Sequence, residues 1–258
     1  FTLGFLTWAS FAQDLYVDDN SYVYSRDVVL FVTNDVRLET PTSNIFLRGD
    51  SQLLQANDIK NSDIGELSIY QEQTTGIYEY NYWSSPVGVG IDGILRANLP
   101  FDVTNVHDPD DETDLSNVLS TPYTFIPVGG GYDSSPLALA GYWVYSLQDA
   151  DGYNDWFQVG TTNTVGPGYG FTLKGTPNPP PPALQDGLNT LDFRGRPNNG
   201  NMTVSLNYTG DGEPLSEPNN QVTTLTGNPY PSALDMKLFF VNSINNQNNT
   251  DGNIYFWQ

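Results

Sequence analysis

Three short segments rich in glycine, proline and aromatic residues divide this chain, at residues 82–88, 167–171 and 225–232. Their sequences are Tyr-Trp-Ser-Ser-Pro-Val-Gly, Pro-Gly-Tyr-Gly-Phe and Leu-Thr-Gly-Asn-Pro-Tyr-Pro-Ser. Glycine permits positive φ and proline fixes φ, so such segments occur where a chain must bend in one particular way between strands. None of their residues is an obvious catalyst. We therefore interpret the three segments as fixed corners of a β-rich framework.

Strand-like runs dominate the sequence after residue 13. In the first of them, apolar residues recur every seven positions, at Val17, Tyr24, Phe31, Leu38 and Ile45. A helical heptad has the same spacing, but the surrounding windows are β-branched or aromatic and are separated by Asp, Asn and Pro turns. Residues 13–55 are therefore predicted to form a short β-repeat segment. The spacing fits both the coils of a small β-solenoid and a meander of hairpins.

The polar stretch 56–66 lacks strand alternation and is predicted to be a linker. From residue 67 to residue 258, strand-like runs recur at the spacing of an antiparallel β-sandwich, which we expect to be truncated at its C-terminal end. The expected strands are 67–71, 77–83, 123–126, 141–147, 156–159, 170–173, 190–193, 202–208, 221–225 and 254–257. The sequence thus predicts an all-β protein.

At most one or two short helices are expected. The best candidate is 232–241, where Ser232 can cap and apolar residues fall on one face, and a single turn is expected at 114–119. Long loops are expected at 86–122 and 177–187, and such loops are either decoration or binding surface.

The first twelve residues form an uncharged apolar run that ends in Ser-Phe-Ala. We interpret residues 1–12 as the tail of a secretory signal peptide, cleaved after Ala12. A buried first strand is the alternative, but Asp14, Asp18 and Asp19 follow at once without a Gly or Pro turn. No other stretch approaches the roughly 20 apolar residues of a membrane-spanning helix. We therefore expect a secreted or cell-surface protein that does not insert into the membrane.

Charge and cysteine content exclude several classes of partner and site. Nine Lys and Arg against thirty Asp and Glu give a formal net charge of −21. We therefore expect neither nucleic acid nor an anionic membrane as a partner, since phosphate binding requires clustered cations. The chain has no cysteine, which excludes disulfides and thiolate metal sites.

No residue is singled out as a catalyst. The only histidine, His107, lies in a loop crowded with carboxylates, and the chain has no Gly-x-Ser-x-Gly segment for a nucleophilic serine. A glycosidase needs only two suitably spaced carboxylates, but no spacing among the thirty acids marks a pair.

Calcium is the cofactor that the acidic loops best fit, because this cation prefers several carboxylate and carbonyl oxygens on a flexible loop. The first loop offers Asp108, Asp110, Asp111, Glu112 and Asp114. The second offers Asp149, Asp151 and Asp155 and begins Asp-x-Asp-Gly, although its sixth and twelfth positions depart from an EF-hand. Solvated turn acids are the plainer interpretation of both loops.

A ligand platform could be formed by the aromatic residues beside the second loop. These are Tyr142, Trp143, Tyr153 and Trp156. If they are exposed, they can line a groove for a carbohydrate; if they are buried among strands, they are core.

Four motifs in order carry a resemblance to a known group of proteins. They span residues 80–88, 167–175, 193–200 and 225–235. Together they resemble the N-terminal portion of large secreted or surface-anchored proteins of Bacteroidota, especially flavobacteria, that are exported by the type IX secretion system. The resemblance extends from Asp14 to Trp257 and implies a downstream sorting domain.

These observations favour a noncatalytic extracellular structural or adhesive module of a larger secreted bacterial protein. The alternative is a carbohydrate-binding or glycan-processing accessory module, stabilised by calcium. The expected partners are an extracellular polysaccharide, another surface protein, or downstream domains of the same chain.

Overall fold

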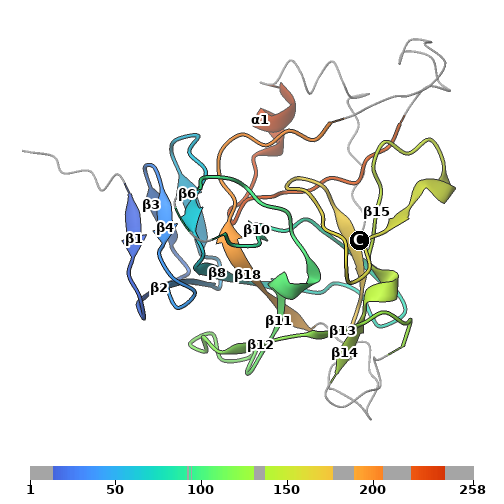
Figure 1. The fold of residues 1–258 in the computed structure, drawn as a ribbon, viewed down its shortest axis with the longest axis horizontal. Helices are drawn as coiled ribbons and strands as arrows, with labels where there is room; N and C mark the ends of the chain where they lie inside the picture. Colours follow the sequence, from blue (N-terminus) through green and yellow to red (C-terminus); the bar gives the residue numbers. More distant parts are fainter. Residues whose placement is uncertain are drawn as a thin grey trace, which may run out of the picture.

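The computed structural model describes residues 14–91, 93, 95–130, 137–176, 189–205 and 222–241, and it contains many strands and one short helix (Figure 1). The predicted all-β class is confirmed. The predicted signal segment, the loop at 177–187 and the last predicted strand lie outside the described residues.

The first eight strands form a three-sided β-solenoid, seen at the blue end of the ribbon in Figure 1. They are β1 (Leu15–Val17), β2 (Tyr22–Arg26), β3 (Val29–Val32), β4 (Val36–Leu38), β5 (Asn44–Arg48), β6 (Gln52–Gln55), β7 (Ser62–Asp63) and β8 (Glu66–Glu72). Strands of the same side pair in parallel, as β1-β4-β7, β2-β5-β8 and β3-β6. Leu15 pairs with Val36 and Tyr22 with Asn44, so one coil takes about 22 residues. Three sides of about seven residues explain the sevenfold spacing, and the solenoid replaces the alternative meander.

The residues of the sevenfold series do not all face inward. Leu38 and Ile45 are fully buried, whereas Phe31 is 64% exposed. Side chains alternate along a strand, so a step of seven reverses the direction unless the corner between two sides restores it. The spacing therefore predicts the sides of the coil but not which residue fills its interior.

The predicted linker at 56–66 is part of the sheets. It contains β7, which pairs with β4, and the first residue of β8, which pairs with β5. The alternation is missing because polar side chains fill the interior at this coil. The buried Asn61 accepts a hydrogen bond from the Val36 amide (2.9 Å) and donates one to the Pro197 carbonyl (2.8 Å).

The second part of the chain adds short strands and turns to the solenoid. They are β9 (Tyr80–Trp83), β10 (Val87–Gly88), η1 (Val103–Asn105), β11 (Val106–Pro109), β12 (Ser120–Pro122), β13 (Thr124–Ile126), β14 (Ala138–Ala140), η2 (Gly141–Trp143), β15 (Tyr145–Ser146), η3 (Tyr153–Asp155), β16 (Phe157–Gln158), β17 (Phe171–Lys174), β18 (Thr190–Pro197) and α1 (Met236–Val241). Strand β18 joins the two parts, because it pairs antiparallel with β8 on one side and with β11 on the other. One sheet therefore runs in the order β12-β11-β18-β8-β5-β2.

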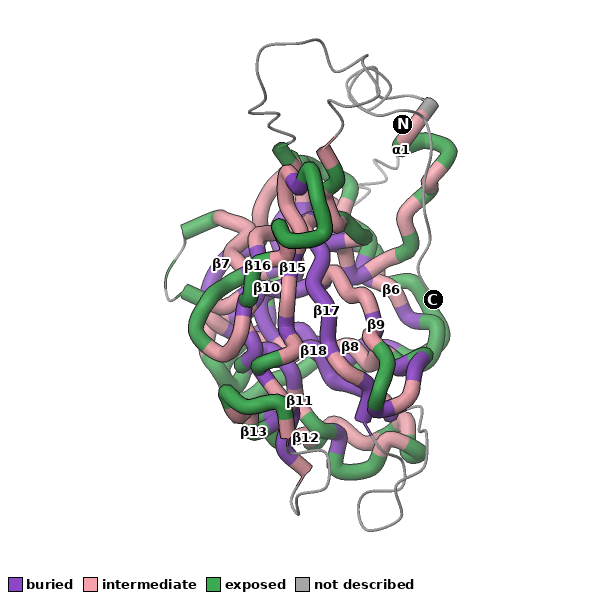
Figure 2. Tube along the Cα trace, turned by 90° about the vertical axis from the view of Figure 1, so that its right-hand side faces the viewer, coloured by how far each residue is buried: buried purple, intermediate pink, exposed green. Residues whose placement is uncertain are grey.

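A layer formed by β9 and β17 packs over this sheet. Phe171 of β17 stacks on Phe101 with ring centroids 4.4 Å apart, and Trp83 of β9 lies 5.5 Å from Phe193 of β18. Figure 2 shows β17 and β18 as buried traces in the interior of the molecule. The buried residues form one hydrophobic cluster that reaches from Val17 in the first coil to Phe193.

Several predicted boundaries differ from the structure. The predicted loop 86–122 carries β10, η1, β11 and β12. The helix starts at Met236 instead of Ser232, because the Asp235 carboxylate accepts a hydrogen bond from the Leu238 amide (3.0 Å) and so caps it. Residues 114–119 form turns, and 202–205 form no strand. None of the described helices has the length and apolar character needed to cross a membrane.

Candidate functional site

The three Gly/Pro/aromatic segments meet at one place in the structure. Tyr169 and Thr226 form an antiparallel bridge, and the Gly170 amide donates to the Leu225 carbonyl (2.8 Å). The Thr226 hydroxyl donates to the Gly168 carbonyl (2.6 Å). The second and third segments are therefore held together by backbone and side-chain hydrogen bonds.

Asn198 connects the first segment to the third. Its buried side-chain amide donates to the carbonyls of Ser85 and Pro229, both at 3.2 Å. Its backbone amide donates to the Pro86 carbonyl (3.0 Å). Asn198 lies in the motif 193–200, so all four motifs of the sequence converge on this junction.

The junction is tight at Gly227. A Cβ atom there would lie 2.6 Å from the Cβ of Ser84, closer than two such atoms approach in proteins. Gly168 has a φ of +89°, a conformation that other residues rarely adopt. The glycines therefore serve close approach and turning, as the sequence predicts.

Asn228 holds the bend of the third segment. Its side chain donates to the Ser232 carbonyl (2.5 Å) and accepts from the Tyr230 amide (3.1 Å). Asn228 therefore acts as a backbone-bonded turn residue.

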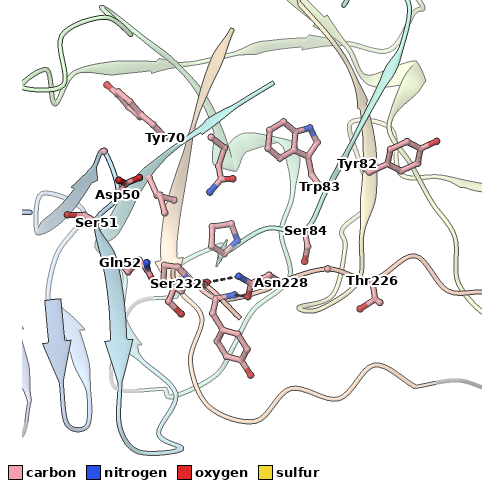
Figure 3. A pocket seen from close by; sticks show the side chains of 18 of the residues that line it. Asp50, Ser51, Gln52, Tyr70, Tyr82, Trp83, Ser84, Thr226, Asn228 and Ser232 are labelled. Atoms are coloured by element: carbon pink, nitrogen blue, oxygen red, sulfur yellow. Dashed lines mark hydrogen bonds between the residues drawn. The ribbon is translucent and has the colours of Figure 1, made fainter. Parts of the chain in front are cut away.

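A groove of about 620 Å³ opens at this junction, and we call it the junction groove (Figure 3). Its described lining residues are Gly49, Asp50, Ser51, Gln52, Ile69, Tyr70, Gln71, Tyr82, Trp83, Ser84, Pro86, Leu225, Thr226, Gly227, Asn228, Tyr230, Pro231, Ser232 and Ala233. They come from the solenoid, from the first segment and from the third. The volume falls within the range of small-molecule sites in proteins.

Trp83 is held in place from behind, because it packs on Phe193 in the core. Tyr70 pairs with Asp192 and Ile69 with Phe193, so the Tyr70 side chain lies on the opposite face of this sheet, with the Arg48 guanidinium 3.7 Å from the centroid of its ring. Figure 3 shows the Tyr70 and Trp83 rings on opposite sides of the strand between them, and Tyr82 pointing away from the other labelled side chains. Tyr70 and Trp83 are both half-buried, so part of each side chain meets solvent.

The lining carries little charge. Asp50 is its only charged residue, and none of the described lining residues is Lys, Arg or His. Gln52, Gln71 and Asn228 contribute amides, and Ser84, Thr226 and Ser232 contribute hydroxyls. The Ser84 hydroxyl oxygen is buried without a hydrogen-bond partner. Such an arrangement suits a polar, uncharged ligand better than an ion.

The first predicted calcium loop braces the solenoid. Its carboxylates serve local contacts: Asp111 accepts from Thr113, Asp114 accepts from Ser116, and Glu112 accepts from the Thr190 amide (2.8 Å). Bonds from Thr113 hold the pKa of Asp111 below its usual range, and bonds from Ser116 do so for the pKa of Asp114. The Asp108 carboxylate accepts from the Tyr123 hydroxyl (3.0 Å), and burial raises the pKa of Asp108.

This loop covers the outer face of the solenoid sheet. The Tyr24 hydroxyl donates to the Leu115 carbonyl (2.7 Å), and the Arg48 guanidinium donates to the Asn117 carbonyl (3.2 Å). Arg48 is fully buried by this cover. Asp110 remains exposed.

The second predicted calcium loop is closed by its own turn. The Asp155 carboxylate accepts from the amides of Asp151 and Gly152, both at 3.0 Å, and these bonds lower the pKa of Asp155. The Asp149 amide donates to the Thr224 hydroxyl (3.0 Å). Within the described residues, no three His, Cys, Asp or Glu side chains form a group that could hold a metal ion. Calcium binding at either loop stays a prediction.

The predicted aromatic platform is exposed in part. Tyr153 is 87% exposed and Tyr142 is 43% exposed, whereas Trp143 and Trp156 are half-buried. The rings of Tyr142 and Trp143 are 4.7 Å apart and perpendicular, at 88°. The Trp143 indole donates to the Gly129 carbonyl (3.1 Å). This pair therefore offers an edge instead of a flat stacking face.

His107 lies beside a serine and an aspartate, the residue types of a catalytic triad. Its Nδ1 is 3.4 Å from the Ser120 hydroxyl, and it pairs with Asp192 across the sheet. The Asp192 carboxylate, however, accepts hydrogen bonds from Ser68 (2.6 Å) and Arg194 (2.7 Å). Burial and the nearby Arg194 lower the pKa of His107. The carboxylate is thus engaged in a buried structural network.

Sequence reasoning missed Asp50, Tyr70 and Gln71 as candidate site residues. They lie in the solenoid and have no motif of their own, and only the fold brings them beside Trp83 and Asn228. The order of the four motifs was the one signal in the sequence that these corners form a unit.

The model of the family described as Domain of unknown function (DUF8693) matches residues 118–258. No curated protein and no solved structure matches the chain. The matched range includes three of the four motifs and excludes the solenoid.

Proposed function

The chain belongs to the DUF8693 family, and we propose that it is a noncatalytic structural or adhesive module of a larger secreted or surface-anchored bacterial protein. The strongest support is the sheet β12-β11-β18-β8-β5-β2, which passes from the second part of the chain into the solenoid without interruption. A shared sheet and a shared core resist bending between the two parts. Such a unit can act as a stiff spacer or presenting surface.

The use of the acidic and imidazole groups also supports a noncatalytic role. The carboxylates of Asp111, Asp114 and Asp155 accept hydrogen bonds that close their own turns. Asp192 beside His107 is engaged by Ser68 and Arg194. A general base must be within reach of the proton it removes, and these groups are committed to structure.

The proposed extracellular location rests on the four motifs that resemble type IX-secreted proteins of Bacteroidota. The net charge of −21 and the absence of cysteine are compatible with it. An extracellular polysaccharide or another surface protein is the proposed adhesion target.

Mechanical unfolding of the molecule tests the structural role. Because the chain has no cysteine, Ser21→Cys and Asn201→Cys supply two unique handles, both at exposed positions, for single-molecule force spectroscopy. The proposal expects the solenoid and the second part to rupture in one step. Two well-separated ruptures contradict a single stiff unit.

The adhesive and noncatalytic parts are tested together. Beads coated with the chain should be retained on immobilised polysaccharide more than beads coated with heat-unfolded chain. Release of reducing sugar from the same polysaccharides should stay at the level of the blank. Sustained turnover contradicts the proposal.

The exposure of Tyr153 and Tyr142 favours a second candidate, carbohydrate recognition at the predicted platform. A glycan array tests it with the parent chain and with Tyr142→Ala and Tyr153→Ala. Loss of a specific signal in both variants supports this platform, and an unchanged signal removes it.

A further inference from the structure

The junction groove occurs where the solenoid lacks a strand. In the described part of the chain, two sides of the solenoid have three strands each, whereas the third has only β3 and β6. Residues 229–233 come beside β6 instead. The Leu53 amide donates to the Pro231 carbonyl (2.9 Å), and the Ala233 amide donates to the Gln52 side chain (2.9 Å). This irregular segment fills the position less fully than a strand, and a cavity results.

The groove has a rigid aromatic wall. Trp83 packs on Phe193 in the core, so its ring does not need to be ordered when a ligand enters. Preordered aromatic side chains bind at a low cost in conformational entropy. An aromatic wall also suits the apolar C–H face of a sugar ring.

Polar groups without structural duties lie in the groove beside Trp83. Asp50 is exposed and Gln71 is half-buried, and neither side chain hydrogen-bonds to another described residue. The Ser84 hydroxyl is buried without a partner, which is uncommon for a native polar group, and Ser84 is one of the lining residues.

We propose that the junction groove is a binding site for a neutral saccharide. Trp83 holds a sugar ring by its apolar face. Asp50 and Gln71 bind its hydroxyl groups, and Ser84 supplies a further hydrogen bond. This function goes beyond the structural role, which needs no ligand at this site.

The chemistry of the lining favours a saccharide over other classes. The groove has one carboxylate and no cation among its described lining residues, so an anionic ligand would meet only repulsion in a chain of net charge −21. An extended peptide would bind by adding a strand to β6. That mode is obstructed because Leu53 and Gln52 already bind residues 231 and 233.

The test is isothermal titration calorimetry with four probes. They are neutral tetrasaccharides of glucose, N-acetylglucosamine and mannose, and an oligogalacturonate as the anionic comparison. The proposal expects millimolar or tighter binding of at least one neutral probe and none of the anionic probe. Asp50→Asn and Gln71→Ala should each weaken binding by about tenfold, as expected for the loss of one hydrogen bond to a ligand. Phe31→Ala, at an exposed ring outside both the groove and the aromatic platform, should leave the affinity unchanged.

Thermal melting of each variant shows whether it is folded, and Trp83→Phe gives a second variant that keeps a ring in the core. It should weaken binding without abolishing it. The proposal is overturned if no neutral probe binds, or if binding is lost in Tyr153→Ala but not in Asp50→Asn and Gln71→Ala.

Discussion

The solenoid and the junction hold their shape by different means. In the solenoid, strands pair with partners about 22 residues away, and aliphatic side chains such as Leu38, Ile45 and Leu67 fill the interior. At the junction, Asn198 reaches Ser85 across 113 positions of the sequence, and amide side chains bind backbone carbonyls. Repetition builds the first region, whereas a few specific polar contacts build the second.

Stability and function are therefore distributed differently between the two regions. The apolar coils of the solenoid tolerate outward substitutions, because aliphatic side chains fill their interior and polar side chains enter it only at the third coil. The junction depends on particular residues that are already in place around a groove. Substitutions in the two regions should therefore differ in how much stability they remove and in which parts of the chain they affect.

The largest effect is expected from Leu38→Ala in the solenoid. Leu38 is fully buried, and its truncation leaves a cavity, which costs about 3 kcal/mol of unfolding free energy. Urea denaturation measures this loss. Phe31→Ala, at a side chain that is 64% exposed, is the control and should change stability far less. Equal losses would contradict the placement of Leu38 in the interior and of Phe31 on the outer face of the solenoid.

Asn198→Ala comes next and acts on the junction. It removes two side-chain hydrogen bonds and leaves the buried carbonyls of Ser85 and Pro229 without the Asn198 donor, which costs about 2 kcal/mol of unfolding free energy. In this variant, the rate of hydrogen exchange relative to the parent chain should increase more at residues 225–230 than in β5. Asn163→Ala, at an exposed asparagine, is the matched control. Uniform acceleration in both regions would contradict the distinction between them.

Gly227→Ala should cost about 1 kcal/mol, because the new Cβ would lie 2.6 Å from the Ser84 Cβ and the two segments must separate. Gly152→Ala is the control, since a Cβ added there would meet no atom within 4 Å and the φ of Gly152 is −157°. The melting temperatures of both variants check this prediction. An undisturbed Gly227→Ala protein would mean that the first and third segments are not in close contact.

A smaller, pH-dependent effect is expected at Asp35, which is 2% exposed in the solenoid. Burial raises the pKa of Asp35, although Ser62 and Arg96 favour its charged form. A raised pKa in the folded state contributes stability below the unfolded pKa of about 3.9 and loses it as the pH rises through the folded value. Asp35→Asn should therefore gain stability relative to the parent chain as the pH rises from acid to neutral.

Urea midpoints across this range measure the gain at Asp35. Asp50→Asn, at a carboxylate that is exposed to solvent, is the comparison. If Asp35→Asn instead loses stability relative to the parent chain as the pH rises, the Arg96 ion pair outweighs burial.

The smallest effect is expected from calcium. If the second acidic loop binds it, millimolar calcium raises the melting temperature, and Asp149→Ala or Asp151→Ala removes the increase. Asp27→Ala, at an exposed acid outside both loops, should keep the response. No response in the parent chain would leave these carboxylates as turn residues only.

The β-repeat segment could be predicted because repetition leaves a signal that a single sequence can show. The sevenfold spacing of Val17, Leu38 and Ile45 follows from sides of similar length. The third coil escaped prediction because Asn61 and Ser62 are polar, although both are buried there by hydrogen bonds. An apolar pattern cannot reveal an interior filled by polar side chains.

Much less of the candidate site could be predicted from the sequence. The Gly/Pro/aromatic segments could be identified as corners, but what they enclose depends on pairings such as Asp192 with Tyr70 that no local pattern encodes. Asp50 and Gln71 are ordinary polar residues of short strands and turns. Their proximity to Trp83 is a property of the assembled fold.

Binding of a neutral saccharide where the three segments join can be observed residue by residue. The measurement is an NMR titration of the ¹⁵N-labelled chain with the best-binding tetrasaccharide. We predict shifts in the amides of Tyr70 and Gln71, of 82–84, of 225–228, and of Tyr230 and Ser232, with the amides of the residues around Tyr142 and Tyr153 unchanged. Shifts confined to residues 142–156, or no shifts at saturating saccharide, would contradict a saccharide site in the junction groove.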